Sequence, residues 1–278
     1  MEKLQIAIEH ARKRRESKEA KAPPKDRTAD EGAVNLVEQP DDAWAALKPF
    51  APNARTLARN RIVVENDDGG AKTAIDILRT RLLTMMRAND WTRVMLTSPT
   101  SGCGKSTLAA NLAMSLQRQE DLKILLIDLD LQQMSLGDKL GLSPEKGVAD
   151  FLSGSVSATD QFHRIGENLA VSVGRSRAIV ERELLKSAGA QRQIDAAEAA
   201  LKPDIVLFDM PPVFATDDTI FAAGFVDCAV VIGAAEQTTI AELEEVEQDL
   251  AQYTNIAGVV LNKSRFAPKH AGYGYKYR

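Results

Sequence analysis

The chain has 278 residues, of which 44% are hydrophobic and 27% are charged, and its formal net charge is −4. This composition is typical of a soluble globular protein, and every apolar run is far shorter than the roughly 18 residues that a membrane helix needs. Two cysteines argue against a disulfide framework and a structural zinc site, and no signal peptide is evident at the start. We therefore expect a cytoplasmic protein.

Charge is spread unevenly along the chain. Residues 1–27 carry a net charge of +4, residues 263–278 carry five basic and no acidic residues, and the middle is left with −13. Basic ends on an acidic body are expected to meet something anionic, such as a membrane surface, an acidic partner or the body itself. Solvated tails without a partner are the alternative. Nucleic-acid binding is not expected, because the acidic body would repel a phosphate backbone.

Two segments precede the regular part of the chain. Apolar residues on one helical stripe predict an amphipathic helix over residues 1–16, which would dock on a partner, a membrane or its own domain. Residues 17–70 are polar, contain several prolines and show no sustained period. They are typical of a largely irregular linker.

From residue 71 onward, apolar periodicity alternates between the helical and the strand pattern. In chain order it predicts a helix over 71–86, a strand over 94–97, a helix over 105–118, a strand over 123–128, a helical region over 178–201, strands over 204–208 and 228–232, a helix over 238–252 and a strand over 257–261. This order indicates an α/β fold with a doubly wound, mostly parallel sheet flanked by helices. We expect one domain over 71–262 and a basic tail over 263–278.

Residues 98–107, Ser-Pro-Thr-Ser-Gly-Cys-Gly-Lys-Ser-Thr, lie where a predicted strand meets a predicted helix. Their last four residues match a P-loop, although Pro99 stands where the strict pattern has glycine. The glycines let backbone N–H groups surround phosphate oxygens, Lys105 reaches the β- and γ-phosphates, and the Ser106 hydroxyl is placed for Mg²⁺. A glycine-rich turn with an incidental lysine is the alternative. The expected nucleotide contacts are Gly102, Cys103, Gly104, Lys105, Ser106 and Thr107.

Three aspartates follow predicted strands. Asp128 and Asp130 end the strand over 123–128, and period two places them on the same side. Beside a triphosphate, one can hold the metal while the other accepts a proton or orients water. Asp209 ends an apolar strand in the manner of a Walker B motif, which orients Mg²⁺ or its waters. Strand-end caps are the alternative interpretation for all three.

These three motifs, in this order, resemble the deviant P-loop ATPases, which include chromosome-partitioning and septum-placement ATPases and the bacterial tyrosine kinases of capsule and exopolysaccharide assembly. The partitioning branch has a signature lysine where this chain has Thr100. The likeness covers about residues 54–278. The features that resemble the kinases are Asn111 in Ala-Ala-Asn-Leu-Ala, the segments Arg61-Ile-Val-Val and Ile77-Leu-Arg-Thr80, and Val259-Val-Leu-Asn-Lys263 ahead of a tyrosine-bearing tail.

The resemblance implies ATP and Mg²⁺ as cofactors and the tail tyrosines as autophosphorylation sites, namely Tyr273, Tyr275 and Tyr277. It further implies that Lys105, Asp128 and Asp130 carry catalysis, that Ser106, Asp128 and Asp209 hold the metal, and that Asn262 contacts adenine. An ordinary glycine-tyrosine tail is the alternative. By the same resemblance, a separate membrane protein of the polysaccharide co-polymerase type would activate the chain. From the uneven charge we further expect self-association and contact of the basic termini with the inner face of the plasma membrane.

Two departures from the kinase pattern favour other functions. Gln132 stands where the kinases have an arginine. A helix motif that the kinases use for ring assembly appears here as Thr73, Asp76 and Arg79, so that only its last element, Arg79, is retained. The tyrosine kinase interpretation therefore stands beside two alternatives. One is a nucleotide-driven dimer switch of the partitioning kind, and the other is a kinase-like scaffold that binds ATP with little turnover.

Overall fold

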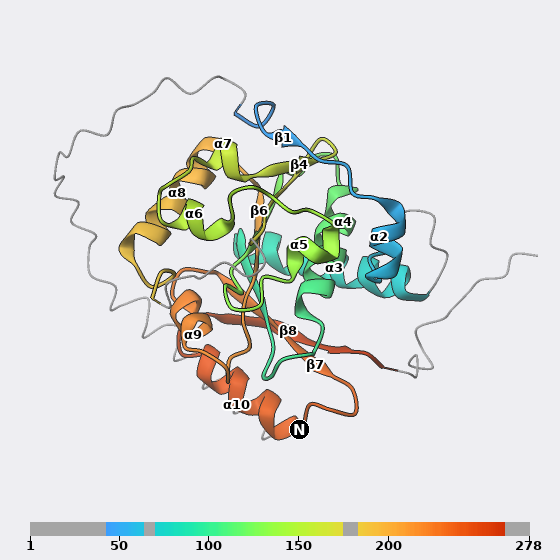
Figure 1. Ribbon diagram of the computed structural model, residues 1–278. Coiled ribbons are helices and arrows are strands. Elements are labelled where there is room, and N and C mark those ends of the chain that lie inside the picture. The colour runs from blue at the N-terminus through green and yellow to red at the C-terminus, as the bar shows by residue number, and fades with distance from the viewer. Residues whose placement is uncertain (1–42, 64–69, 175–182, 265–278) are drawn as a thin grey trace, which may run out of the picture. The chain divides into compact units, whose positions relative to one another are not determined.

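A computed structural model describes residues 43–63, 70–174 and 183–264. In this part of the chain, an eight-stranded sheet is covered by helices on both faces (Figure 1). The strands are β1 (Lys48–Pro49), β2 (Arg93–Thr97), β3 (Ile124–Asp128), β4 (His163–Ile165), β5 (Leu169–Ser172), β6 (Ile205–Asp209), β7 (Cys228–Ala234) and β8 (Asn255–Asn262). The helices are α2 (Ala54–Arg59), α3 (Gly70–Asn89), α4 (Lys105–Gln117), α5 (Leu136–Leu140), α6 (Val148–Leu152), α7 (Ala158–Gln161), α8 (Ala188–Leu201), α9 (Asp218–Ala223) and α10 (Ile240–Leu250).

The sheet has the order β1-β4-β5-β3-β6-β2-β7-β8. Its pairs are parallel except β4 with β5, so β1 and β4 run opposite to the other six strands. Strand β6 lies between β2 and β3, and the register aligns Asp209 with Leu96 on one side and with Asp128 on the other. The carboxyl ends of β2, β3 and β6 therefore meet at one edge, which is where ligands bind in open α/β sheets.

Two apolar layers hold the helices on the sheet. On one face, Leu82 of α3 and Leu112 of α4 pack with alternate residues of the central strands. On the other face, Ile194 of α8 and Leu250 of α10 pack with the remaining strand residues, including Phe208. Because both faces are covered, β3 and β6 are buried along their whole length, which explains why they read as continuous apolar runs.

The predicted mostly parallel α/β sheet is confirmed, and the long elements agree with the sequence pattern to within a few residues. The predicted helical region over 178–201 is confirmed from residue 188 onward and is wrong at residues 183–186. Residues 175–182 lie outside the described chain, residues 183–186 form turns, and α8 begins only at Ala188. The Ser187 side chain accepts a hydrogen bond from the Ala190 N–H and so caps this helix.

The described part of the expected linker, residues 43–63, contains regular structure that the sequence pattern missed. Strand β1 pairs with β4, and α2 places Leu57 in the same apolar layer as α3 and α4. Trp44 is buried in the other layer, and its indole N–H donates to the Glu167 carbonyl at 2.7 Å. The predicted helix over 1–16 and the tail tyrosines lie outside the described residues, and the domain limits stay predictions.

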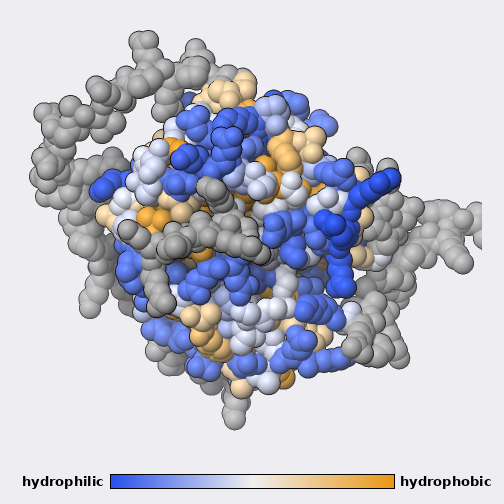
Figure 2. Space-filling view, viewed as in Figure 1, coloured by the Kyte–Doolittle hydropathy of each residue, from blue (hydrophilic) through white to orange (hydrophobic). Residues whose placement is uncertain are grey.

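Polar residues cover most of the face seen in Figure 2, and apolar residues appear there in small groups. Among the helices of the described ranges, none is both long and apolar enough to cross a bilayer.

Candidate functional site

The loop between β2 and α4 has the backbone of a phosphate cradle. Gly102 and Gly104 have φ angles of 83° and 91°, in the left-handed region that favours glycine. A Cβ at Gly104 would also collide with the side-chain amide of Asn262. Helix α4 begins at Lys105 without a side-chain cap and without an acid in its first turn. Its first N–H groups and the helix dipole therefore favour an anion at this end.

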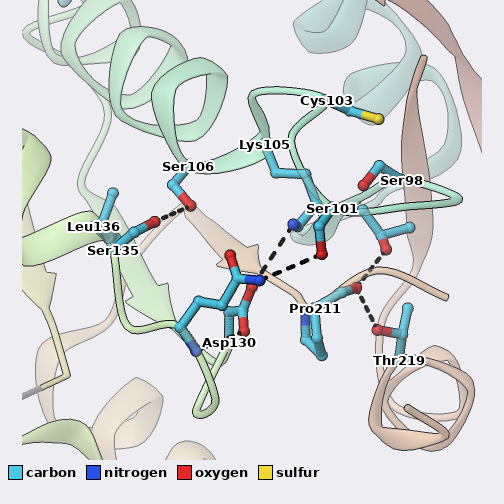
Figure 3. Close-up of polar contacts among 12 residues, drawn as sticks. Ser98, Ser101, Cys103, Lys105, Ser106, Asp130, Ser135, Leu136, Pro211 and Thr219 are labelled. Carbon is cyan, nitrogen blue, oxygen red and sulfur yellow. Dashed lines mark hydrogen bonds and ion pairs between the residues drawn. The ribbon is translucent and has the colours of Figure 1, made fainter. Parts of the chain in front are cut away.

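The three predicted aspartates come together beside this loop, as the strand order requires. Asp128 and Asp209 are fully buried and Asp130 is 2% exposed. The Lys105 ammonium lies 3.6 Å from an Asp130 carboxylate oxygen, and both side chains are buried (Figure 3). Asp128 accepts hydrogen bonds from the Asp130 and Leu136 N–H groups. Burial, together with repulsion from Asp209 and Asp130, raises the pKa of Asp128 well above its usual range.

Asp209 is the member of this group that lacks partners. Neither of its carboxylate oxygens has a hydrogen-bond partner among the described residues. Burial raises the pKa of Asp209 to about 7, although the nearby Ser106 hydroxyl and Lys105 ammonium act in the opposite direction. A buried carboxylate without a partner is costly, so a cation at this point would stabilise its charged form.

These residues fit a nucleotide-bound Mg²⁺. In the described ranges, no three His, Cys, Asp or Glu side chains are arranged to hold an ion by themselves. Mg²⁺ does not need such a cage, because it is usually bound through one or two carboxylates together with waters and substrate phosphates. The Ser106 hydroxyl and the unpartnered Asp209 carboxylate supply oxygen ligands of this kind next to the phosphate cradle.

The segment that follows β3, residues 130–136, lies across the P-loop and contacts it at three points. Besides the Lys105–Asp130 ion pair, the Gln133 amide donates to the Ser101 hydroxyl at 3.3 Å. The Ser135 hydroxyl donates to the Ser106 hydroxyl oxygen at 2.9 Å (Figure 3). Sequence reasoning missed Gln133 and Ser135, because neither belongs to a motif and both residue types are common in loops.

The chain after Asp209 is joined to the start of the P-loop by hydrogen bonds. The N–H groups of Met210, Val213 and Phe214 donate to the carbonyls of residues 96, 98 and 99. The Pro211 carbonyl accepts the Thr97 and Thr219 hydroxyls, each at 2.8 Å, and Figure 3 shows Thr219 approaching it from α9. The strand end that carries Asp209 is thereby held against the strand that leads into the P-loop.

The remaining nucleotide residues expected from the sequence also surround the loop. The Asn262 amide donates to the Cys103 carbonyl at 2.8 Å, which brings the end of β8 against the P-loop. The buried Cys103 thiol donates to the Thr100 carbonyl. Thr107 lies in the first turn of α4, where its carbonyl accepts the Asn111 amide. The contact of Asn262 with adenine stays a prediction.

The structure shows the surroundings of Thr100, of Gln132 and of the helix motif that contains Asp76 and Arg79. Thr100 and Gln132 are exposed at the surface. Asp76 pairs with Arg118 and accepts the Ser115 hydroxyl at 2.8 Å, while Arg79 donates to the Ser115 carbonyl at 3.1 Å. Asp76 and Arg79 therefore join α3 to α4 within the chain.

Comparison with known proteins decides the family. Residues 94–271, more than half of the chain, match the family described as "CobQ/CobB/MinD/ParA nucleotide binding domain". The chain belongs to this nucleotide-binding family. The resemblance to the deviant P-loop ATPases is thus confirmed.

The proteins similar to this chain include bacterial tyrosine kinases. Tyrosine-protein kinase YwqD of Bacillus subtilis is 31% identical over 185 residues, which are 66% of this chain and 76% of YwqD. Tyrosine-protein kinase Wzc of Salmonella typhi is 30% identical over 248 residues, covering 85% of this chain and 33% of Wzc. The kinase domain of Escherichia coli ETK has 27% identity and a TM-score of 0.66, over 77% of this chain and 84% of that domain. The chain spans only about a quarter to a third of the longer relatives EpsB and Wzc.

Proposed function

We propose that this chain is an ATP-dependent protein-tyrosine autokinase that phosphorylates its own tail at Tyr273, Tyr275 and Tyr277 and thereby regulates capsular or exopolysaccharide synthesis and export. The observation that carries the proposal is the buried pairing of Lys105 with Asp130 at 3.6 Å, directly beside Ser106 and Asp209. A phosphate-binding lysine, an acceptor carboxylate and oxygen ligands for a cation lie together there. The likeness to tyrosine kinases supports the same reaction.

The roles follow from position. Lys105 would bind the β- and γ-phosphates of ATP, and Ser106, Asp209 and Asp128 would hold Mg²⁺, which neutralises phosphate charge when bound. Asp130 would accept the proton of the tyrosine hydroxyl while the tyrosine oxygen forms a bond to the γ-phosphorus. The bond from that phosphorus to the bridging oxygen breaks at the same time, and ADP leaves. Because Lys105 is paired with Asp130 in the structure, arriving phosphates would draw the lysine away and free this carboxylate.

Thr100 favours a kinase over the nucleotide-driven switch. This position holds the signature lysine of the partitioning branch, and here it is an exposed, neutral side chain. The scaffold alternative is favoured by Gln132 and by the intramolecular use of Asp76 and Arg79. A cytoplasmic location, a membrane activator and self-association belong to the proposal by likeness to the kinases.

A mixing experiment tests the proposed substrate. An inactive Lys105→Met protein with an intact tail is incubated with Mg²⁺-ATP and an active protein that lacks residues 270–278. The expected result is phosphotyrosine on the inactive protein, located by peptide mass spectrometry at residues 273, 275 and 277. If those tyrosines stay unmodified over a wide range of concentrations, transfer between molecules is excluded. If the unmodified chain incubated with Mg²⁺-ATP also shows no phosphotyrosine, the autokinase proposal is wrong.

A further inference from the structure

We infer that Ser135 is a positioning residue, whose hydroxyl orients the Ser106 hydroxyl toward a cation bound with the nucleotide. The inference rests on the nucleotide-binding part of the proposed function and adds a residue that the P-loop motif does not contain. Ser135 lies outside the P-loop, at the end of the 130–136 segment, yet its hydroxyl donates to Ser106 at 2.9 Å (Figure 3).

Hydrogen-bond accounting shows what this contact does. A serine hydroxyl has one proton to donate and two lone pairs that accept. Ser135 occupies one lone pair of Ser106. The Ser106 hydroxyl also lies near the Asp209 carboxylate, whose oxygens have no hydrogen-bond partner among the described residues, so this carboxylate is available to take the Ser106 proton. One lone pair of Ser106 then remains, fixed in direction, for a cation at the phosphate cradle.

Ser135 is itself held on both sides. The Met134 N–H donates to the Asp130 carbonyl at 2.8 Å, and the Met134 side chain is buried. On the other side, the Leu136 N–H donates to Asp128 and the Leu136 side chain is fully buried. A side chain between two anchored neighbours loses little additional freedom when it makes a hydrogen bond, so Ser135 can set the Ser106 hydroxyl before nucleotide arrives.

Loss of the Ser135 hydroxyl should affect binding of the cation and not binding of the phosphates. Without the Ser135 hydroxyl, Ser106 can rotate and its lone pair is no longer directed at one point. The phosphate cradle, formed by backbone N–H groups and Lys105, is unaffected. Removal of this hydroxyl should therefore weaken nucleotide binding that depends on Mg²⁺ and leave binding without Mg²⁺ unchanged.

The test measures ADP binding to the full chain by calorimetry, once with Mg²⁺ and once with EDTA. For Ser135→Ala we expect affinity to fall about 3- to 10-fold with Mg²⁺, the loss typical of one hydrogen bond, and to stay the same in EDTA. Ser135→Thr keeps the hydroxyl and should restore the Mg²⁺-dependent affinity. Gln133→Ala is the matched control, because it removes a contact of the same segment to Ser101 instead of Ser106. The change in ADP affinity caused by Gln133→Ala should be the same with Mg²⁺ and with EDTA.

Three results with the variants would overturn the inference. The first is a Ser135→Ala variant in which Mg²⁺ increases ADP affinity as much as in the unmodified chain. The second is an equal loss of ADP affinity with Mg²⁺ and with EDTA. The third is a Ser135→Thr variant in which Mg²⁺ does not increase ADP affinity as it does in the unmodified chain. Thermal unfolding of each variant shows whether the fold is kept. If the unmodified chain binds ADP no more tightly with Mg²⁺ than without, the inference also fails. Mg²⁺-dependent ADP binding without any tyrosine phosphorylation would overturn the autokinase proposal alone.

Discussion

The buried carboxyl group of Asp209 makes a contribution to folding stability that depends on pH. Asp209 is fully buried, without a hydrogen-bond partner in the described chain, and its pKa is raised from 3.8 to about 7. Between these two values the folded chain keeps a proton that the unfolded chain has released. In the absence of a cation, the contribution of Asp209 to stability therefore falls as pH rises from about 4 to about 7.

Asp209→Asn should raise the melting temperature of the chain in EDTA more at pH 8 than at pH 5. At pH 8 the substitution removes a buried negative charge, whereas at pH 5 it replaces a carboxyl group that is already neutral. Thermal unfolding at both pH values measures the difference. Asp121→Asn, at an exposed position, is the control and should show little change at either pH. An equal shift at pH 5 and pH 8 for Asp209→Asn would contradict the raised pKa.

Asp130→Asn should separate nucleotide binding from catalysis. The substitution keeps the size of the side chain and removes its charge, so Lys105 loses an ion-pair partner that competes with phosphate. ATP affinity should be equal or higher by calorimetry, while phosphotyrosine formation falls by at least about 10²-fold, as is typical of the loss of a general base. Loss of ATP binding would instead identify Asp130 as a metal ligand.

The residues of the site were predictable where they belong to a motif with a fixed chemical reason. Lys105 and Ser106 follow from the P-loop, and the aspartates follow from strands that end at the same sheet edge. Ser135 and Thr219 were not predictable, because a hydroxyl that binds a neighbouring loop leaves no periodic signal in the sequence. Their contacts depend on how turns bring segments together.

At the scale of elements, α4 is the structural link between the N-terminal part of the described chain and the P-loop. The Asn111 side chain on α4 accepts the Val63 N–H at 2.7 Å and donates to the carbonyls of Arg61 and Thr107 at 3.0 and 2.8 Å. Two of the features that resemble the kinases, the Asn-bearing helix and the Arg61 segment, are thus in contact with each other in the structure.

Asn111→Ala should lower the free energy of unfolding by about 1–3 kcal/mol, because it removes three hydrogen bonds between a buried side chain and the backbone. Chemical denaturation monitored by circular dichroism measures the change. Asn89→Ala is a matched control. Asn89 also binds the carbonyl four residues before it in a helix, but it is exposed, and within the described residues its side chain has no long-range hydrogen bond. If both substitutions change stability equally, the contact between α4 and residues 61–63 adds nothing.

Element length explains which parts of the fold the sequence predicts. Helices such as α3 and α4 and the buried strands have enough residues to show a period. The helices α5, α6 and α7 have four or five residues each, too few for a helical period to be recognised. Strand β1 has only two residues, so tertiary pairing with β4 defines it.

At the scale of the whole molecule, charge should govern how one chain meets another. Residues 263–278 carry five basic residues, and the middle of the chain carries a net charge of −13. Transfer of phosphate between molecules should therefore slow as salt rises, since ions screen this attraction over roughly 10 Å at 0.1 M. The rate of the mixing reaction at several ionic strengths measures this effect. A rate that does not depend on salt would show that tail charge plays no part in docking.

Phosphorylation should in turn loosen self-association. Each phosphotyrosine adds about −1.5 to −2 charges, so modification of three tyrosines offsets the basic charge of the tail. Sedimentation of the chain before and after incubation with Mg²⁺-ATP should show a shift toward smaller species. No shift, or a shift toward larger species, would contradict this expectation.

The central claim is that the P-loop, the three buried aspartates and the tail tyrosines act together as an autokinase. Intact mass after incubation with Mg²⁺-ATP tests this most directly, with the Lys105→Met protein and a protein without residues 270–278 as controls. The account predicts that the unmodified chain gains mass in steps of one phosphoryl group, up to three, and that each control incubated alone gains none. A chain that binds ATP but keeps its original mass would contradict the account and favour the scaffold or the switch.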